Sequence, residues 1–533
     1  MSTRHGQPLA GGLEQRQQRS SLEGPPVPLS RAGSFAYSGV QQQGYAAGVW
    51  LRRKDRRLER SQQKCIAIFA LVCCFAVLLA LIFSAVDVWG EDEDGITEEN
   101  CSTSCQIVLV ENIPEEVSFS ENSTVHLPLS VGLHLLLDLA SRSVEIVSPD
   151  WALTSADPEA DVSSARQARL LFQRLQGLGS RGVNLKVASD RPDSAELRKL
   201  SNHGAEVRYL NLAALTKGQF RSSFWVVDRK HMYIGSGGMD WHSLSKVKEF
   251  GVIISNCSCL VLDLHRIFSL YWQLQYKDFV PSIWSKRLSA LYSKEQVLAL
   301  SFNNSRKAKA YMSSSPDVFC PKDRTRDIDA IFRLIQDARR FIYISVTDYL
   351  PLINRTPQRY WSRIDGMLRE ALILRGIKVK LLISCWRQTH PLTFNFVWSL
   401  KSLCMGMANC SLEVKFFSLR DQKNGTFHSV NHNKFMVTDT AVYIGSLDWL
   451  GNEFAYNVGV GLVISQAEGP GDQGAPVVGQ VKALFERDWF SCYAKSLQPN
   501  KLPECSKLRN SPPPLPKAQT NSRDLKQKPS TLL

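Results

Sequence analysis

Short apolar runs recur between residues 106 and 500, and five of them occur twice in the same order. The first copies are SVEIVSPDW (143–151), RGVNLKV (181–187), AEVRYLNL (205–212), FWVVDRKHMYIGSGGMDW (224–241) and GVIIS (251–255). The second copies are FIYISVTDY (341–349), RGIKVKL (375–381), LEVKFFSL (412–419), FMVTDTAVYIGSLDW (435–449) and GLVIS (461–465). Each run has the length and β-branched content of a buried strand. Helix-like segments such as 165–178 and 328–339 lie between the runs, so the pattern predicts two similar α/β halves that together form one site.

One apolar run has a different character, because Cys65–Val86 holds 22 residues without a charge. That length can cross a hydrocarbon core of about 30 Å. A signal peptide and a buried core helix are the alternatives, but a signal peptide starts nearer the first residue and has a shorter apolar run. Basic residues crowd the segment before the run and only acidic residues follow it closely. The sequence therefore predicts a type II, single-pass membrane protein with a cytoplasmic N-terminus and a lumenal or extracellular body.

The net charge of +14 lies mostly at the two ends of the chain. Residues 1–64 carry +7 and residues 501–533 carry +5, which leaves +2 for the rest. A basic nucleic-acid groove in the folded body is therefore disfavoured. We predict a disordered cytoplasmic tail (1–64), the membrane helix (65–86), an acidic linker (87–105), two halves (106–300 and 301–505) and a disordered end (506–533).

Ten of the thirteen cysteines follow the apolar run, an even number suited to disulfides in an oxidising compartment. Zinc at Cys257 and Cys259, or at Cys404 and Cys410, is an alternative that lacks convincing partner ligands nearby. All the N-x-[ST] sequons also follow the run, which supports a glycosylated lumenal body. The sequons begin at Asn100, Asn122, Asn256, Asn303, Asn354, Asn409 and Asn424.

The candidate chemistry lies in the second half. His432, Asn433 and Lys434 are followed, after four intervening residues, by Asp439 and then by a Gly445-Ser446 turn. On an extended strand the side chains of His432 and Lys434 point to the same face, which suits joint contact with a phosphate. Together with the duplication, this spacing resembles the phospholipase D superfamily, whose signature H-x-K-x(4)-D with a Gly-Ser turn and an Asn occurs once per half. The resemblance covers roughly residues 106–500 and is strongest to the single-pass membrane branch, including an inactive member.

The resemblance implies two halves that are each a mixed β-sheet flanked by helices. It also implies a two-step phosphodiester hydrolysis. One histidine forms a phosphohistidine and the other protonates the leaving oxygen and then activates water. The two lysines and two asparagines hold the non-bridging oxygens. We expect the aspartate of each motif to orient its histidine.

Residue by residue, the match is incomplete. In the second half His432, Lys434 and Asp439 agree with the signature, but Asp448 stands at the asparagine position. In the first half Asp228 agrees. Arg221 replaces the histidine, Ser223 the lysine and Gly238 the asparagine. The internal repeat alone gives the same result, because Arg221 and Ser223 align with His432 and Lys434.

Loss of the covalent nucleophile costs on the order of 10⁴ to 10⁶ in rate, and a guanidinium cannot replace it. We therefore predict an inactive, phospholipase D-like membrane glycoprotein with a binding or regulatory role and no cofactor or metal. Residual phosphodiesterase activity through His432, of phospholipase or acid 5′ exonuclease type, is the alternative, and a purely structural scaffold is another. A protein partner, a phosphate-bearing ligand and a homodimer stay open. The identity of the membrane also stays open, and the candidates are the endoplasmic reticulum, the Golgi, the endolysosome and the cell surface.

Overall fold

The structure, a computed structural model, describes residues 64–80, 101, 103–121, 123–154, 165–275, 277–302, 306–353, 355, 357–418, 430–466, 476–498 and 505. The chain divides into two compact units, residues 1–82 and 83–533. In the first unit residues 64–80 form a helix with exposed side chains. No described helix has the length and apolarity needed to span a bilayer. Residues 81–86 of the predicted membrane segment and both predicted disordered tails, apart from Lys64, lie outside the described residues.

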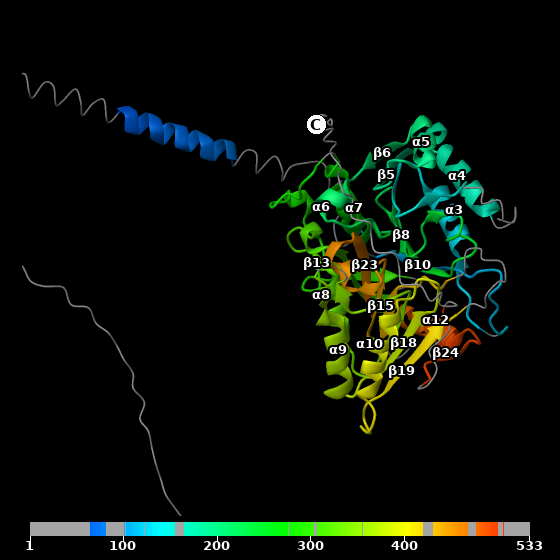
Figure 1. The fold of residues 1–533 in the computed structure, drawn as a ribbon. Helices are drawn as coiled ribbons and strands as arrows, with labels where there is room; N and C mark the ends of the chain where they lie inside the picture. The colour runs from blue at the N-terminus through cyan, green and yellow to red at the C-terminus, as the bar shows by residue number, and fades with distance from the viewer. Residues whose placement is uncertain are drawn as a thin grey trace, which may run out of the picture. The chain divides into compact units, whose positions relative to one another are not determined.

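The second unit is a mixed α/β structure with two large sheets (Figure 1). In Figure 1 strands β5 and β6 of the first sheet lie in the upper part of this unit, and β18 and β19 of the second lie in the lower part. The first sheet has the order β2 (Leu127–Pro128), β1 (Gln106–Asn112), β10 (Glu249–Ser255), β8 (His231–Gly235), β7 (Phe224–Val227), β3 (Ser143–Val147), β5 (Asn184–Ser189), β6 (Glu206–Tyr209).

The second sheet repeats this plan. Its order is β11 (Leu298–Phe302), β12 (Arg306–Ser315), β23 (Gly459–Ser465), β21 (Ala441–Gly445), β20 (Phe435–Thr438), β14 (Phe341–Val346), β18 (Lys378–Ser384), β19 (Leu412–Phe417), β24 (Ala494–Ser496), with β13 (Thr325–Arg326) beside β12. In both sheets three consecutive strands are parallel and their neighbours are antiparallel, so each sheet is mixed. Strand β11 crosses the predicted boundary between the halves, which follows residue 300, and the whole strand belongs to the second sheet.

Helices connect and cover the strands. They are α3 (Leu129–Leu139), α4 (Arg166–Gln176), α5 (Ala195–Asn202), α6 (Leu212–Leu215), α7 (Ser258–Gln273), α8 (Asp327–Asp337), α9 (Ser362–Ile373), α10 (Pro391–Ser402), α11 (Gly451–Tyr456) and α12 (Val477–Phe490). Most apolar residues of α4 and α8 recur every three to four positions and are buried, whereas most of the intervening polar residues are more exposed. These two helices match the segments predicted at 165–178 and 328–339.

The two halves are joined by a pair of equivalent backbone contacts. Phe220 pairs with Val458, and Asn431 pairs with Lys248. Asn431 corresponds to Phe220 in the repeat, and Val458 to Lys248, so the two contacts are related by the duplication. The segments that carry Arg221 and His432 therefore each lie against the opposite half, where one site can form.

Four disulfides cross-link the second unit: Cys101–Cys259, Cys105–Cys257, Cys385–Cys505 and Cys404–Cys410. The four cysteines considered as zinc ligands are thus bonded to sulfur, and the described part of the chain holds no cluster of three or more metal-ligating side chains. Cys320 and Cys492 are free, so eight of the ten cysteines after the apolar run form disulfides.

Candidate functional site

His432 lies just before β20 and contacts a carboxylate of the other half. Its Nδ1 is 3.2 Å from Oε1 of Glu249, the first residue of β10. Glu249 is fully buried and also accepts hydrogen bonds from the hydroxyl groups of Ser236 and Ser243. This buried, hydrogen-bonded carboxylate orients the imidazole. The sequence analysis did not identify Glu249 as a site residue. A signal was present, because Glu249 is a charged residue at the start of an apolar strand and the equivalent position in the second half is Gly459.

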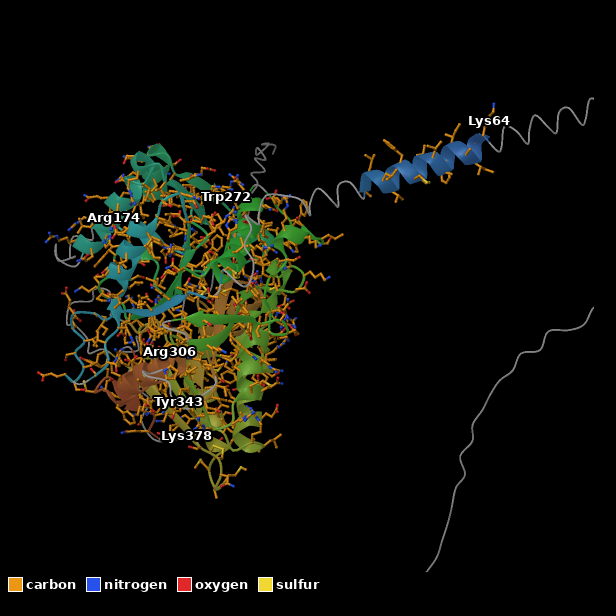
Figure 2. All side chains as sticks on the ribbon, turned by 180° about the vertical axis from the view of Figure 1, so that it is seen from behind. Lys64, Arg174, Trp272, Arg306, Tyr343 and Lys378 are labelled. Carbon is orange, nitrogen blue, oxygen red and sulfur yellow. A yellow bond between two sulfur atoms is a disulfide. The ribbon has the colours of Figure 1, made fainter. Side chains whose placement is uncertain are left out.

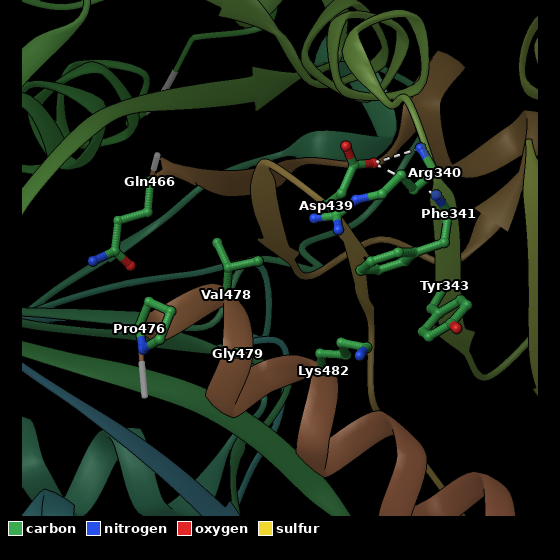
Figure 3. A pocket seen from close by; sticks show the side chains of 9 residues that line it. All are labelled: Arg340, Phe341, Tyr343, Asp439, Gln466, Pro476, Val478, Gly479 and Lys482. Atoms are coloured by element: carbon green, nitrogen blue, oxygen red, sulfur yellow. Dashed lines mark hydrogen bonds between the residues drawn. The ribbon is translucent and has the colours of Figure 1, made fainter. Parts of the chain in front are cut away.

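The expectation that Asp439 orients His432 is wrong. The two residues lie beyond opposite ends of β20, and an extended segment of seven residues spans roughly 20 Å. The Asp439 carboxylate instead accepts hydrogen bonds from the backbone N–H groups of Arg339, Arg340 and Phe341, at 3.0, 3.1 and 3.5 Å. Figure 3 shows the bonds to Arg340 and Phe341. Burial raises the pKa of Asp439, but these hydrogen bonds outweigh it and leave the pKa below its usual value.

Asp228 has the same role in the first half. Its carboxylate accepts the N–H groups of Ser141, Arg142 and Ser143 at 2.7 to 2.8 Å. Each aspartate thus fixes the turn before a central strand, β3 or β14, because it satisfies backbone donors that would otherwise lack partners. Both are scaffold residues, which explains why Asp228 persists beside a replaced histidine.

We expect Asp439→Ala to lower the free energy of unfolding by about 1 to 3 kcal/mol, because it leaves backbone donors unsatisfied. The effect should be additive with that of His432→Ala, whereas Glu249→Gln and His432→Ala should be coupled. Chemical denaturation of the single and double variants measures both. Coupling between Asp439 and His432 above about 0.5 kcal/mol would restore the original expectation.

Lys434 is held by groups of its own half. Its Nζ lies 3.1 Å from the carbonyl oxygen of His432 and 3.7 Å from Oδ2 of Asp448, and its side chain is 8% exposed. Asp448 also accepts the backbone N–H groups of Thr347 and Asp348. The carboxylate at the asparagine position therefore faces the one lysine that the signature retains, and it competes with any phosphate for that charge.

The first half presents altered chemistry at each equivalent position. Arg221 Nε lies 3.3 Å from Oε1 of the buried Glu453 on α11. Ser223 is buried, and its hydroxyl donates to the carbonyl of Gly237. Its own carbonyl accepts from Gly235 N, as that of Lys434 accepts from Gly445 N, so Ser223 occupies the lysine position geometrically. No hydrogen bond or ion pair joins Arg221 to His432 among the contacts of the described residues.

Gly238 leaves space where the signature has asparagine. A Cβ at this position would lie 3.4 Å from both Ser148 Oγ and Asp240 Oδ2, which is ordinary contact. Its backbone N–H donates to Ser243 Oγ at 3.2 Å. The position therefore has room for a side-chain stem, but it lacks the amide that would hold a phosphate oxygen.

Acidic groups accumulate around these residues. Burial, together with the neighbouring Asp448, raises the pKa of Asp348 to about 7. Burial and Asp240 raise the pKa of Asp150, which interacts electrostatically with Arg221 and His432. Burial also raises the pKa of Glu453, although Arg221 acts in the opposite direction. An additional negative charge at this site is therefore unfavourable.

We expect Asp348→Asn to stabilise the protein near neutral pH. The folded-state pKa of Asp348 is raised, so its contribution to stability is complete below about pH 4 and is lost as the pH rises through about 7. The amide keeps an acceptor for Trp386 Nε1, which lies 3.2 Å from Asp348 Oδ1. The variant should gain about 1 kcal/mol or more above pH 7 and lose this advantage towards about pH 4. Thermal unfolding across this range measures it, and a pH-independent difference would contradict the assignment.

Comparison with known proteins places this architecture in a family. A model described as "PLD3/4, PLD-like domain" matches residues 120–422. The chain is 53% identical to mouse inactive phospholipase D5, over 93% of each chain. It is 41% identical to the mouse 5′-3′ exonuclease PLD4, over 75% of this chain and 81% of the relative. It is 38% identical to the Xenopus laevis 5′-3′ exonuclease PLD3, over 86% of this chain and 96% of the relative.

These relatives agree with the site geometry. The chain is more similar in sequence to the relative named inactive, at 53% identity, than to the two exonucleases, at 41% and 38%. The protein is a phospholipase D-like protein that lacks phosphodiesterase activity. It belongs to the phospholipase D family.

Proposed function

We propose that this protein uses the phospholipase D scaffold to bind a protein partner and not to hydrolyse a phosphodiester. One observation carries the proposal: Arg221 and Lys434, the cations at the two motif positions, are paired with Glu453 and Asp448. A phosphate would have to displace these carboxylates and would also meet Asp348 nearby. The charge balance thus favours a protein partner over a phosphate-bearing ligand or a nucleic acid, while homodimer formation stays a prediction.

We further propose that residues 65–86 anchor the chain in a membrane, with the folded body in the lumen or outside the cell. The described residues 64–80 are helical, and four disulfides suit an oxidising compartment. Asn256 and Asn409 are exposed and accessible to glycosylation, whereas the other five sequon asparagines lie outside the described residues. Release of the full-length chain from membranes by alkaline extraction would contradict the anchor.

A binding measurement tests the loss of phosphate recognition. We expect neither millimolar inorganic phosphate nor a short phosphorothioate oligonucleotide to raise the melting temperature of the detergent-purified full-length chain. The control variant Asp448→Asn with Glu453→Gln removes both competing carboxylates, so it should gain a phosphate-dependent shift. Saturable stabilisation of the wild type by phosphate would contradict the proposal and favour a phosphate-bearing ligand.

A further inference from the structure

A second group of chemically active side chains lies in a pocket of the first half, apart from the site around His432. The pocket has a volume of about 240 Å³ and is lined by residues of β3, β5 and α7, among others. Trp272, which is labelled in Figure 2, forms part of its wall. None of its lining residues belongs to the altered phospholipase D motifs, so those motifs do not explain it.

Three lining residues form a hydrogen-bonded relay. Ser269 Oγ is 3.3 Å from His265 Nε2, and His265 Nδ1 is 2.7 Å from Glu145 Oε2. Ser269 and His265 are four residues apart on α7, so consecutive turns present them on one face. Glu145 reaches the histidine from β3. The order hydroxyl, imidazole, carboxylate is that of a nucleophile, its base and the group that orients the base.

The surroundings favour proton transfer along this relay. The side chains of His265 and Glu145 are only 11% and 6% exposed, whereas Ser269 is less deeply buried at the pocket. A carboxylate can only accept a hydrogen bond, so Nδ1 carries the proton and the lone pair of Nε2 faces the hydroxyl. The low dielectric around Glu145 strengthens its attraction to the imidazolium that forms when Ser269 gives up its proton.

The second half shows that the fold does not require the relay. The segments FSLYWQLQY (268–276) and FERDWFSCY (485–493) align, which places Glu486 at the position of Ser269 and Lys482 at that of His265. Tyr343 replaces Glu145 and stacks on Phe485 at 5.0 Å (Figure 2 labels Tyr343). Both halves thus pack this helix on the sheet, but only the first half does so with a serine, a histidine and a carboxylate.

By contrast, both halves place cations around a tryptophan that occurs at equivalent positions of the repeat. Lys186 and Arg208 lie over Trp272, and Lys380 and Lys415 lie over Trp489. These contacts belong to the scaffold. The relay is an addition to that scaffold in one half.

The charge of the pocket indicates the class of ligand. Its lining includes four cationic side chains, Lys186, Arg229, Arg266 and Arg287, against the single carboxylate of Glu145. Arg266 also donates to the carbonyl of Ser289 at 3.0 Å, which fixes its position. An excess of positive charge in the lining attracts a ligand that carries an anionic group.

We propose that Ser269, His265 and Glu145 form a hydrolytic site for a carboxylic ester that carries an anionic group. Ser269 Oγ bonds to the carbonyl carbon while its proton passes to His265 Nε2. The ester C–O bond then breaks, and the alcohol leaves with that proton. Water attacks the acyl-serine and gives a proton to His265, which returns it to Ser269 Oγ as the carboxylic acid departs. The net reaction converts ester and water into acid and alcohol, and Glu145 acts as a positioning residue.

A covalent probe tests the nucleophile directly. The detergent-purified full-length chain should take up a fluorophosphonate at Ser269, as mapped by peptide mass spectrometry. Labelling should fall about 100-fold or more in Ser269→Ala and in His265→Phe. Glu486→Ala, which alters the corresponding position of the second half, should label like the wild type. No labelling of a folded wild-type chain, or labelling that persists in Ser269→Ala, would overturn the proposal.

An ester assay separates catalysis from a structural role. Mono-4-nitrophenyl succinate should be cleaved faster than neutral 4-nitrophenyl acetate, and Arg287→Ala should reduce this preference. Glu145→Gln should lower kcat and change its pH profile while the melting temperature of the variant reports separately on folding. Equal cleavage by the wild type and Ser269→Ala would overturn the proposal. Glu486→Ala lies outside both the relay and the altered motifs, so it should leave this activity unchanged and serves as the matched control.

Discussion

Lys248→Met should lower the free energy of unfolding by about 3 to 5 kcal/mol, because it breaks a buried ion pair between the halves and leaves the Asp488 carboxylate with Arg487 alone as its charged partner. Lys248 Nζ lies 2.7 Å from Asp488 Oδ2, and both side chains are completely buried. Lys248 comes from the first half and Asp488 from α12 of the second. The ion pair therefore holds the two halves together.

The same residue also positions the altered site. The backbone N–H of Lys248 donates to Val430 O at 2.9 Å, and its carbonyl accepts from His432 N at 2.8 Å. The charge network continues from Asp488 through Arg487 to Glu111. Burial raises the pKa of Glu111, but its hydrogen bond to Arg487 and the charges of Lys248 and Arg487 bring it below the usual value. Lys248→Met keeps these backbone hydrogen bonds, but it removes the Lys248 charge from the network that joins the halves.

Urea denaturation of the full-length chain in detergent measures this effect. Lys378→Met provides the control, since Lys378 Nζ is 3.2 Å from Glu413 Oε1 but both side chains are 46% exposed, and such pairs contribute about 1 kcal/mol or less. Lys248→Met combined with Asp488→Leu should recover part of the loss, because the weakened carboxylate is removed as well and Arg487 keeps Glu111 as its partner. A cost for Lys248→Met as small as that of the control would show that the buried pair does not stabilise the join.

The repeat predicted much of the fold because buried strands read as short apolar runs. The first block of each half became β3 and β14, and the last became β10 and β23. Each pair occupies the same place in its sheet. A pattern of period and order is sufficient for such elements, since burial on both faces constrains every residue of the run.

Contacts between distant segments could not be predicted in the same way. Glu249 and His432 are 183 residues apart, and their contact depends on how the halves join. The spacing of His432 and Asp439 was misleading. The two residues are close in sequence, but the extended strand β20 lies between them and keeps their side chains far apart. The disulfide partners likewise required the three-dimensional arrangement.

Phosphodiester hydrolysis is the second large effect, and we expect it to be absent. An active site of this family needs two histidines, whereas this one has His432 and an arginine bound to Glu453. Loss of the second histidine alone costs on the order of 10⁴ to 10⁶ in rate. Loss of three of the four phosphate-binding groups reduces transition-state stabilisation further. The contact between His432 and Glu249 cannot compensate for the missing histidine, because the reaction needs one histidine as nucleophile and another as acid and base.

The decisive measurement is the hydrolysis of a single-stranded oligonucleotide and of phosphatidylcholine by the detergent-purified full-length chain, at acidic and neutral pH. The exonuclease PLD3 of Xenopus laevis serves as the positive control for the oligonucleotide, and His432→Ala serves as the matched variant. We predict that the wild type shows no turnover above background and does not differ from His432→Ala. Turnover by the wild type that disappears in His432→Ala would contradict the account and establish a phosphodiesterase that works with a single motif histidine.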